Sequence, residues 1–393
     1  MSTVQIKGVR PEFHCRRRPP SPLPSPLPPA AMAKAARSDP PPLAGLREEI
    51  VVWEILVRLP PKPLVRCRAV CRSWRRHLAS PSFLLRHHRH QRSLPLVTGY
   101  KYGGSTYQDI LALDRRTADP AALLQPVARL DDVTLWVEAS CDGILVLSVD
   151  GLYFSVLNPV IGEKASLSVI DGFSFLGFYL HGPSGEYRLL LYRDKELLHE
   201  DLIPGARDCY YVFALGGDLP RCIGWPAMPP CHSTPVLVRS CLHWNPVKKQ
   251  NGGMIAVFDT TAESFRRMRA PNVLSPCLFE MDGTLGMYTC NNGELRRVDI
   301  WVLQDYEREA WEFRYQVELP MAEIRQKFDV CERWSAMVVA EEAGVLVLVH
   351  CERFLLHVDT EGRLRASFHR DGQGLMTSPH MLKQSLVRHA FFP

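Results

Sequence analysis

The stretch Pro60–His90 concentrates residues whose side chains could do chemistry, and three kinds of site are compatible with it. Cys67 and Cys71 are four residues apart, so on one helix they would share a face and could supply two zinc ligands. Histidines of the following "RHHRH" tract, Arg86–His90, could complete such a site. The intervening arginines could instead contact nucleic-acid phosphates or an acidic protein.

The apolar pattern argues against the metal. Both cysteines fall in one stripe of a helix predicted over 64–78, and a free cysteine commonly packs as a small buried hydrophobe. The stripe comprises Cys67, Val70, Cys71, Trp74 and Leu78. We therefore predict packing rather than metal ligation, a solvated helix end for the histidine tract, and no cofactor or metal.

The arginines lie on the other side of that predicted helix. Residues 1–92 hold 18 Lys and Arg against 5 Asp and Glu, a net charge of +13, and the remainder carries 29 against 37, or −8. No recognition-helix, RNP or zinc-finger pattern accompanies the basic face, so nucleic-acid binding is disfavoured against a protein partner. That face comprises Arg68, Arg72, Arg75 and Arg76.

Two further helices should frame this one. A first amphipathic helix is predicted from apolar residues at three- and four-residue spacing, with acidic residues in its first turn and prolines at its end. Ser80–Ser82 should end the second helix, and a short third helix should continue through Leu84 and Leu85. The first helix carries Ile50, Trp53, Ile55, Leu56 and Leu59 after Glu48 and Glu49, and stops at Pro60, Pro61 and Pro63.

The remaining N-terminal segment, 1–42, is rich in proline and arginine and is expected to be a disordered tail. The cysteines are scattered without a C-x-x-C pair, and no N-x-[ST] sequon, signal-peptide h-region or long apolar run occurs. These features favour reduced thiols in a cytoplasmic or nuclear protein without a membrane span.

Residues 93–390 alternate short strand-like runs with Gly, Asp, Asn and Pro turns. A rhythm of strand, turn, strand and a closing Asn or Asp recurs at Asn158, Asp259 and Asp359. It predicts a β-propeller of roughly six blades, with a two-sheet sandwich as the alternative. The fold class is thus α+β and multidomain: helices 43–92, then an all-β domain. Common hydrolase, kinase and nucleotide motifs are absent from the sequence, which disfavours an enzyme.

The helical segment resembles the F-box of plant proteins. "EILVRLP" (Glu54–Pro60) followed by "VCRSWR" (Val70–Arg75) matches that family's pattern. Arg47 stands where the family usually has proline, and Pro63 where it usually has serine. The resemblance implies docking on a Skp-type linker, which joins the F-box to a cullin–RING ubiquitin ligase.

The C-terminal part resembles the F-box-associated domain. "SCDGILVL…LNPVIGE" (Ser140–Glu163), "IAVFDTTAESFRRMRAP" (255–271) and "VDIWVLQDYEREAWEFRYQVELP" (298–320) match its segments. The resemblance implies a propeller-like domain that recruits a target protein.

Together the resemblances imply a non-catalytic adaptor of a Skp–cullin–F-box ligase, whose unknown protein target is held by the β domain. Two alternatives stay open: a transcriptional or carbohydrate-binding scaffold with a vestigial F-box, and a hydrolase hidden in the propeller. No membrane or nucleic-acid partner is expected. The residues expected at the linker contact, some of which could build the module's own core, are Leu46, Ile50, Ile55, Leu56, Leu59, Pro60, Leu64, Val65, Val70, Cys71 and Trp74.

Overall fold

The structure, a computed structural model, describes most of the chain beyond the N-terminal tail. From Leu46 on, the described residues belong to one compact unit, Gly45–Pro393. The predicted tail, 1–42, lies outside them. They are 46–101, 107–116, 123–131, 134–193, 209–224, 233–246, 253–290, 296–328, 334–341, 344–351, 353–370 and 373–392.

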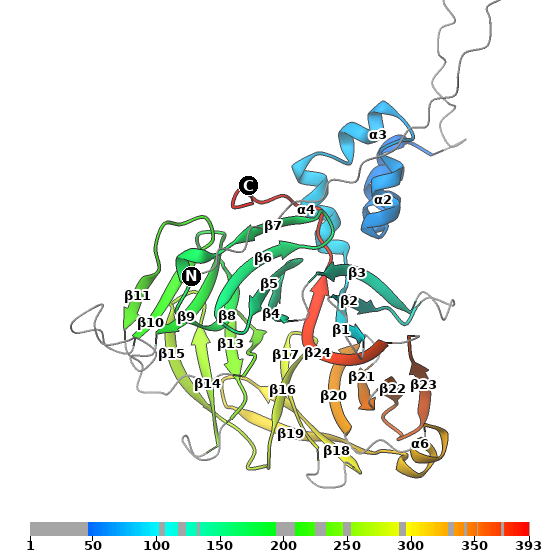
Figure 1. Ribbon diagram of the computed structural model, residues 1–393, viewed down its shortest axis with the longest axis vertical. Helices are drawn as coiled ribbons and strands as arrows, with labels where there is room; N and C mark the ends of the chain where they lie inside the picture. Colours follow the sequence, from blue (N-terminus) through cyan, green and yellow to red (C-terminus); the bar gives the residue numbers. More distant parts are fainter. Residues whose placement is uncertain are drawn as a thin grey trace, which may run out of the picture. The chain divides into compact units, whose positions relative to one another are not determined.

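A helical module, which we define as residues 46–92, comes first (Figure 1). Its first helical stretch passes through three hydrogen-bonding patterns, and three α-helices follow. The elements are α1 (Glu48–Ile50), the π-helical η1 (Val51–Ile55), the 3₁₀ turn η2 (Leu56–Arg58), α2 (Pro61–Cys67), α3 (Arg72–His77) and α4 (Pro81–His90).

The buried face of the first stretch differs from the predicted stripe. Ile50 and Ile55 are exposed, whereas Val51, Val52 and Val57 are buried. The π turn explains part of this difference, because the Leu56 N–H donates to the carbonyls of Val51 and Val52. A π turn holds more residues than an α turn, so it rotates the side chains that follow relative to a 3.6-residue stripe.

The single second helix predicted over 64–78 is wrong: the chain forms two helices there, α2 and α3. Cys71 is extended, with φ −151° and ψ 168°, and its Sγ accepts from the Trp74 N–H at 3.4 Å. Cys71 therefore caps α3 instead of continuing α2. The first of the two helices also begins earlier than predicted, at Pro61, since proline is compatible with the first helical position.

The third predicted helix is present as α4 and is longer than expected. The Ser80 Oγ caps it by accepting from the Phe83 N–H at 3.4 Å. The predicted solvated end is only partly right, because His87 is fully buried and His88 is mostly buried, while Arg89 and His90 are exposed.

The described strands form six four-stranded antiparallel sheets, the blades of a propeller. Six sheets agree with the predicted blade count and rule out the two-sheet sandwich. The first three blades are β24 (Gln373–Lys383), β1 (Ser93–Lys101), β2 (Gln108–Leu113) and β3 (Leu124–Leu130); β4 (Leu135–Cys141), β5 (Ile144–Val149), β6 (Tyr153–Asn158) and β7 (Glu163–Ser166); and β8 (Ser174–His181), β9 (Glu186–Arg193), β10 (Cys209–Ala214) and β11 (Arg221–Gly224).

The other three blades follow in chain order, and two short helices, η4 (Ser168–Ile170) and α6 (Met321–Lys327), lie between blades. These blades are β12 (Val236–Val238), β13 (Cys241–Trp244), β14 (Met254–Asp259) and β15 (Ser264–Arg269); β16 (Cys277–Met281), β17 (Thr284–Cys290), β18 (Arg297–Asp305) and β19 (Ala310–Glu318); and β20 (Trp334–Glu341), β21 (Gly344–Cys351), β22 (Phe354–Val358) and β23 (Leu364–Phe368).

The ring is closed by strands from opposite ends of the domain. β24 pairs antiparallel with β1, from Ser93 opposite Lys383 to Lys101 opposite Gln373. Each pair of neighbouring sheets then shares an apolar cluster, including the pair formed by the first blade and the last, where Val97 and Leu375 pack with Leu346 and Leu348. The last strand of the domain thus completes the blade that its first strands begin, so the ring of blades is closed at the first blade.

The recurring turn residues have a structural reason. Asp142–Gly143 and Asp282–Gly283 form two-residue hairpin turns with positive φ at both positions, where Asp-Gly is favoured. At the far end of the third strand of a blade, the carboxylate or amide oxygen of Asn158, Asp259 or Asp359 accepts backbone N–H groups two to four residues ahead. The repeat in the sequence is thus a repeat of turn chemistry.

The closing strand should carry much of the stability. Leu382 on β24 is fully buried between the first two blades, so Leu382→Ala should lower the free energy of unfolding by about 2–5 kcal/mol, as cavity-forming substitutions do. Urea unfolding measures this. The matched control is Leu152→Ala, whose side chain is exposed in a turn; equal midpoints for the two variants would contradict the closure.

Candidate functional site: the helical module and its anchor

The apolar residues expected to meet a partner divide by burial. Six are exposed on the module's surface, with Val70 the most exposed large one at 57%. They come from the first helical stretch, from the connection to α2, from α2 itself and from the turn after it. These six are Leu46, Ile50, Ile55, Pro60, Val65 and Val70.

The other five expected contact residues lie deeper. Leu56 and Leu64 are buried at 4% and 0% exposure and belong to the module's apolar core. Leu59 and Trp74 are half-buried against the same core, and Cys71 caps α3. The structure thus gives Leu56 and Leu64 a packing role, and a contact role for the exposed residues stays a prediction.

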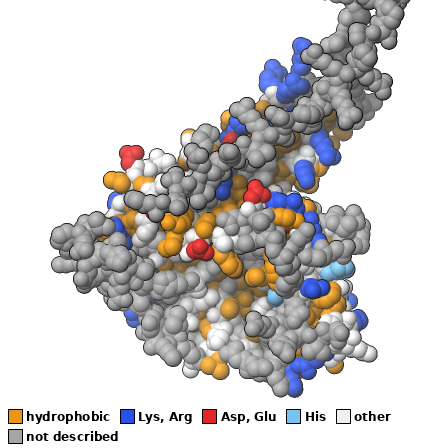
Figure 2. Space-filling view, in the orientation of Figure 1, with side chains coloured by type: hydrophobic (Ala, Val, Ile, Leu, Met, Phe, Trp, Pro, Cys, Tyr) orange, Lys and Arg blue, Asp and Glu red, His pale blue; other side chains and the backbone are white. Residues whose placement is uncertain are grey.

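The basic residues of the module fall into two groups, those that hydrogen-bond to backbone carbonyls and those that are exposed. The Arg68 guanidinium donates to the Leu78 carbonyl at 2.9 Å, and the Arg75 Nε donates to the Arg68 carbonyl at 3.3 Å, so both brace the α2–α3 turn. By contrast, four exposed cations have no carboxylate partner within the described part of the chain: Lys62, Arg66, Arg72 and Arg76. Figure 2 shows blue side chains over α2 and α3.

No metal site forms from the residues considered for one. Cys67 ends α2 and Cys71 caps α3, so the two do not share a helix face. The buried His87 Nε2 donates to the Leu59 carbonyl at 2.8 Å and is committed to that bond. Across the described residues, no group of three or more His, Cys, Asp or Glu side chains is placed to hold a metal ion, and no helix there is long and apolar enough to cross a membrane.

The module is tied to the propeller at His88 of α4. Its Nε2 lies 3.2 Å from the Asp142 Oδ1, and its Nδ1 lies 3.3 Å from the Gln384 carbonyl. The Tyr187 hydroxyl donates to the other oxygen of Asp142 at 3.4 Å. The hydrogen bond from His88 is the main reason that the pKa of the Asp142 carboxyl lies below its usual value.

The chain after β24, residues 384–392, crosses the propeller as a segment that we call the C-terminal strap. Asn158, which is fully buried, donates its amide to the carbonyls of Ser385 and Val387, both at 3.3 Å. Gly143 leaves room for the strap: a Cβ there would lie 2.6 Å from the Ser385 Cβ and 2.7 Å from the Lys383 carbonyl oxygen. The Asn158 and Asp-Gly signature residues therefore also hold the strap.

The strap joins two apolar cores. Leu386, 4% exposed, belongs to the core of the helical module, where Val160 and Ile161 of the propeller also pack. Further on, Phe392 is buried in the core shared by the second and third blades. In Figure 1 the red C-terminal trace leaves β24, passes α4 and runs above β7. One short segment thus contributes to the module's core and to the propeller's.

These anchoring residues were not singled out by sequence reasoning. Asn158 was predicted only as a turn residue, and Asp142–Gly143 appeared only within the motif Ser140–Glu163. Nothing in the local sequence indicates that Leu386 reaches a core formed by residues more than three hundred positions earlier in the chain. His88 was assigned to solvent because a charged helix end is ordinarily exposed. The contact of His88 with Asp142 could be found only from the three-dimensional structure.

Three buried imidazoles remain neutral at neutral pH. Burial lowers the pKa of His243, His357 and His380 to about 4 in each case. His380 is bound through its Nε2, which donates to the Val137 carbonyl at 2.9 Å. In the unfolded chain each imidazole has a pKa of about 6.5, so the unfolded state binds more protons below that pH.

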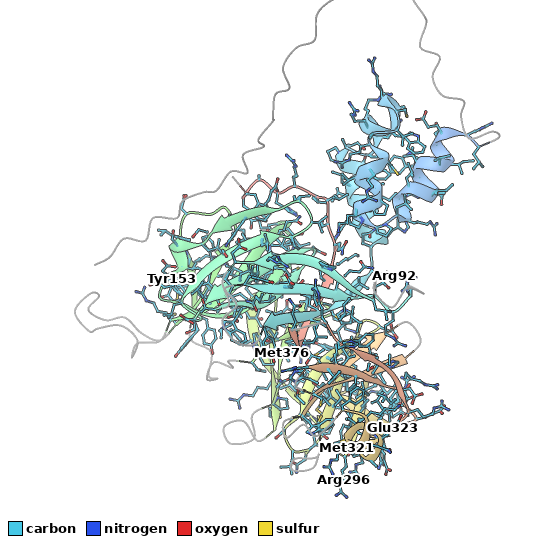
Figure 3. The ribbon with its side chains drawn as sticks, turned by 45° about the vertical axis from the view of Figure 1, so that its right-hand side comes forward. Arg92, Tyr153, Arg296, Met321, Glu323 and Met376 are labelled. Atoms are coloured by element: carbon cyan, nitrogen blue, oxygen red, sulfur yellow. The ribbon has the colours of Figure 1, made fainter. Side chains whose placement is uncertain are left out.

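Weakening the strap should loosen the module. Leu386→Ala removes apolar contacts at a buried site, so the junction should open more often. Trypsin should then cut after Arg92, at the α4–β1 connection labelled in Figure 3, roughly tenfold faster or more. Mass spectrometry of the new N-terminus measures the rate. The control is Leu219→Ala, 78% exposed; an unchanged rate in Leu386→Ala would refute the strap's role.

The buried imidazoles predict a pH dependence of stability. The pKa values of these imidazoles are lower in the folded chain than in the unfolded chain. Their contribution to the free energy of unfolding is therefore complete above about pH 6.5 and declines as the pH falls toward about 4. Urea midpoints should fall between pH 7 and pH 5, and His380→Gln should make that fall shallower. The control is the exposed His369→Gln. Equal slopes for wild type and His380→Gln would contradict the neutral buried form.

Comparison with protein-family models finds two matches. The model of the F-box associated beta propeller domain matches residues 131–361, and the model of the F-box domain matches residues 49–86. The first match alone covers more than half of the chain. The second lies within the helical module, and the first includes the Asp142 and Asn158 turns.

Relatives and solved structures are distant. A protein of Arabidopsis thaliana named as an F-box protein is 24% identical over 285 residues, which cover 67% of this chain and 60% of that protein, so the chain spans less than two thirds of its relative. A chain of a nidogen/laminin complex has 10% identity and a TM-score of 0.40, covering 73% of this chain and 97% of that one. For the dihydro-heme d1 dehydrogenase NirN the values are 12%, 0.31, 71% and 64%. On the strength of the two family matches, the chain belongs to the proteins that combine an F-box with an F-box associated β-propeller domain.

Proposed function

We propose that the chain is the substrate-recruiting adaptor of a Skp–cullin–F-box ubiquitin ligase. In this proposal the F-box module, 43–92, docks on a Skp-type linker, and the β domain, 93–390, holds a target protein. The observation that carries it is the pairing of an exposed apolar and basic F-box surface with a closed propeller, joined through His88 and the strap.

The chemistry of the F-box surface favours an acidic partner with an apolar contact. Ile55, Val65 and Val70 expose aliphatic surface that a partner would bury, and burial of apolar surface is the main favourable contribution to most protein–protein association. Lys62, Arg66, Arg72 and Arg76 carry positive charge without carboxylate partners among the described residues. Charge of one sign around an apolar contact raises the association rate and selects the partner.

The mechanism is proximity rather than catalysis. A target held on the propeller has a raised effective concentration of its lysines near the ubiquitin-carrying enzyme. This mechanism requires no nucleophile or acid–base pair from the adaptor. The strap supports this role, since a fixed F-box restricts where the bound target can reach. We place the protein in the cytoplasm or nucleus, where such ligases act.

The two departures from the family pattern are compatible with this role. Pro63 lies in the first turn of α2, whose N–H groups have no partner within the helix, so the missing donor costs no hydrogen bond. Arg47 is the residue before α1, and its carbonyl accepts from the N–H groups of Ile50 and Val51 at 3.0 and 3.2 Å. Its backbone therefore starts the helix without the usual proline.

Affinity for a purified Skp-type linker tests the proposal. The double variant Ile55→Ala/Val65→Ala removes two exposed side chains and should weaken binding roughly tenfold to a hundredfold, with little change in stability. Isothermal titration calorimetry measures it. Leu64→Ala would be unsuitable, because Leu64 is fully buried and its loss would unfold the module.

The matched control is the pair Leu152→Ala/Leu219→Ala, two exposed leucines of the propeller that should leave the affinity unchanged. If the folded wild-type chain does not bind the linker, the ligase role is wrong and a scaffold with a vestigial F-box takes its place. If the Ile55→Ala/Val65→Ala variant and wild type bound the linker with equal affinity, the proposal that these side chains form the docking surface would be wrong.

A further inference from the structure

The two outer strands of the third blade, β10 and β11, each carry a cysteine (Figure 1). Cys209 is the first residue of β10, and Cys222 lies on β11, directly opposite Tyr211 of β10. Residues opposite one another in an antiparallel pair lie on the same face of the sheet, and so do residues two apart on one strand. Cys209 is two residues before Tyr211, so the register places both thiols on one face of the blade.

The contacts of neighbouring side chains identify this face. Tyr211 packs against the core shared by the second and third blades. Arg221, the residue before Cys222, is directed the other way and forms an ion pair with Glu263 of the fourth blade. Burial raises the pKa of the Tyr211 hydroxyl, and the charges of Cys209 and Cys222 add to that rise. Both cysteines therefore lie beside Tyr211, on the side of the second blade.

The two thiols are in contact across the strand pair. The Cys209 Sγ donates to the Gly224 carbonyl of β11 at 3.4 Å, so this side chain reaches over the neighbouring strand. Burial raises the pKa of the Cys209 thiol, and a side-chain hydrogen bond with Cys222 raises it further. Both residues are free thiols. The register, the Gly224 contact and the thiol–thiol hydrogen bond agree on one cross-strand dithiol.

The two thiols differ in accessibility. Cys222 is exposed, whereas Cys209 is half-buried, so an oxidant in solution meets Cys222 first. A disulfide requires the two β-carbons to lie about 3.5–4.5 Å apart. β11 is a four-residue edge strand that pairs with β10 at three positions. Because it is hydrogen-bonded within its sheet on one side only, it can move to that separation without disturbing a further strand.

We propose that Cys209 and Cys222 form a redox-sensitive dithiol, which a peroxide converts into a disulfide between β10 and β11. The Cys222 sulfur attacks one peroxide oxygen, the O–O bond breaks, and a sulfenic acid and one water result. The Cys209 sulfur then attacks the Cys222 sulfur, the S–O bond breaks, and the hydroxyl leaves with the Cys209 proton as a second water. A thiol reductant reverses the reaction by disulfide exchange. This site is independent of linker docking and of the ligase role.

Peptide mapping of the full chain tests the proposal. The chain is treated with hydrogen peroxide, its remaining thiols are blocked with N-ethylmaleimide, and it is digested with trypsin. Cleavage after Arg207, Arg221 and Arg239 separates Cys209, in peptide 208–221, from Cys222, in peptide 222–239. Mass spectrometry of oxidised wild type should find these two peptides joined with the loss of two hydrogens, and dithiothreitol should separate them.

Single variants distinguish the roles of the two cysteines. Cys209→Ser removes the thiol that attacks the sulfenic acid, so Cys222 should persist as a sulfenic acid and be labelled by dimedone. Cys222→Ser removes the thiol that meets the oxidant, so Cys209 should remain available to N-ethylmaleimide. Because Cys222 is exposed, its replacement should leave the thermal unfolding of the chain unchanged.

The matched control is Cys231→Ser, because Cys231 shares the tryptic peptide of Cys222. This variant should form the same joined peptides as wild type. If Cys209→Ser does not fold, the maps of wild type, Cys222→Ser and Cys231→Ser still decide. Separate peptides in oxidised wild type, or joined peptides that persist in Cys222→Ser, would each overturn the proposal.

Discussion

The antiparallel pairing of β1 with β24 is the interaction on which the rest of the molecule depends. It joins strands separated by almost the whole domain, and its end at Ser93 and Lys383 is where two other segments meet. Helix α4 enters β1 at that end, and the strap leaves β24 there. Closing the ring therefore also brings the F-box and the strap together, so that Leu386 can complete the F-box core.

This arrangement bears on the proposed adaptor role. If the F-box were joined by a flexible linker, a target bound to the propeller could take many positions relative to the F-box. Two anchors between the F-box and the propeller restrict those positions. His88 supplies a polar anchor through Asp142 and the Gln384 carbonyl, and Leu386 supplies an apolar one. Exposed aliphatic and basic residues of the module remain available for the proposed partner, because other residues, such as Leu64 and Arg68, form its core and support the α2–α3 turn.

Much of the fold could be predicted from the sequence because it depends on the conformational preferences of residues in short turns. Asp142–Gly143 and Asp282–Gly283 require positive φ, and Asn158, Asp259 and Asp359 accept turn N–H groups, so repeated hairpins and hence blades could be predicted from these types alone. The "VCRSWR" pattern likewise located the helical module. The pairing of β1 with β24 closes the ring and joins strands that are far apart in the sequence. No local sequence pattern predicts its register.

The errors have equally specific causes. A regular 3.6-residue period was assumed over 64–78, but the Cys71 side chain competes for the Trp74 N–H and ends the period there. The π turn at Val51–Ile55 accounts for part of the difference between the predicted and observed buried faces, in which Ile55 is exposed and Val57 is buried. Some of the residues expected to contact a partner, such as Leu56 and Leu64, are buried in the core of the module. Their burial involves Leu386, which lies far away in the sequence, so the residues around them could not predict it.

The contacts of His88 and Leu386 with the ends of β1 and β24 should make the F-box and the closing strands one cooperative unit. Native-state hydrogen exchange at increasing denaturant measures it most directly, because it gives an opening free energy for each protected amide. We predict that amides of α4, β1 and β24 converge on one common opening free energy. Amides of α4 that open at markedly lower free energy while β1 and β24 stay protected would contradict it.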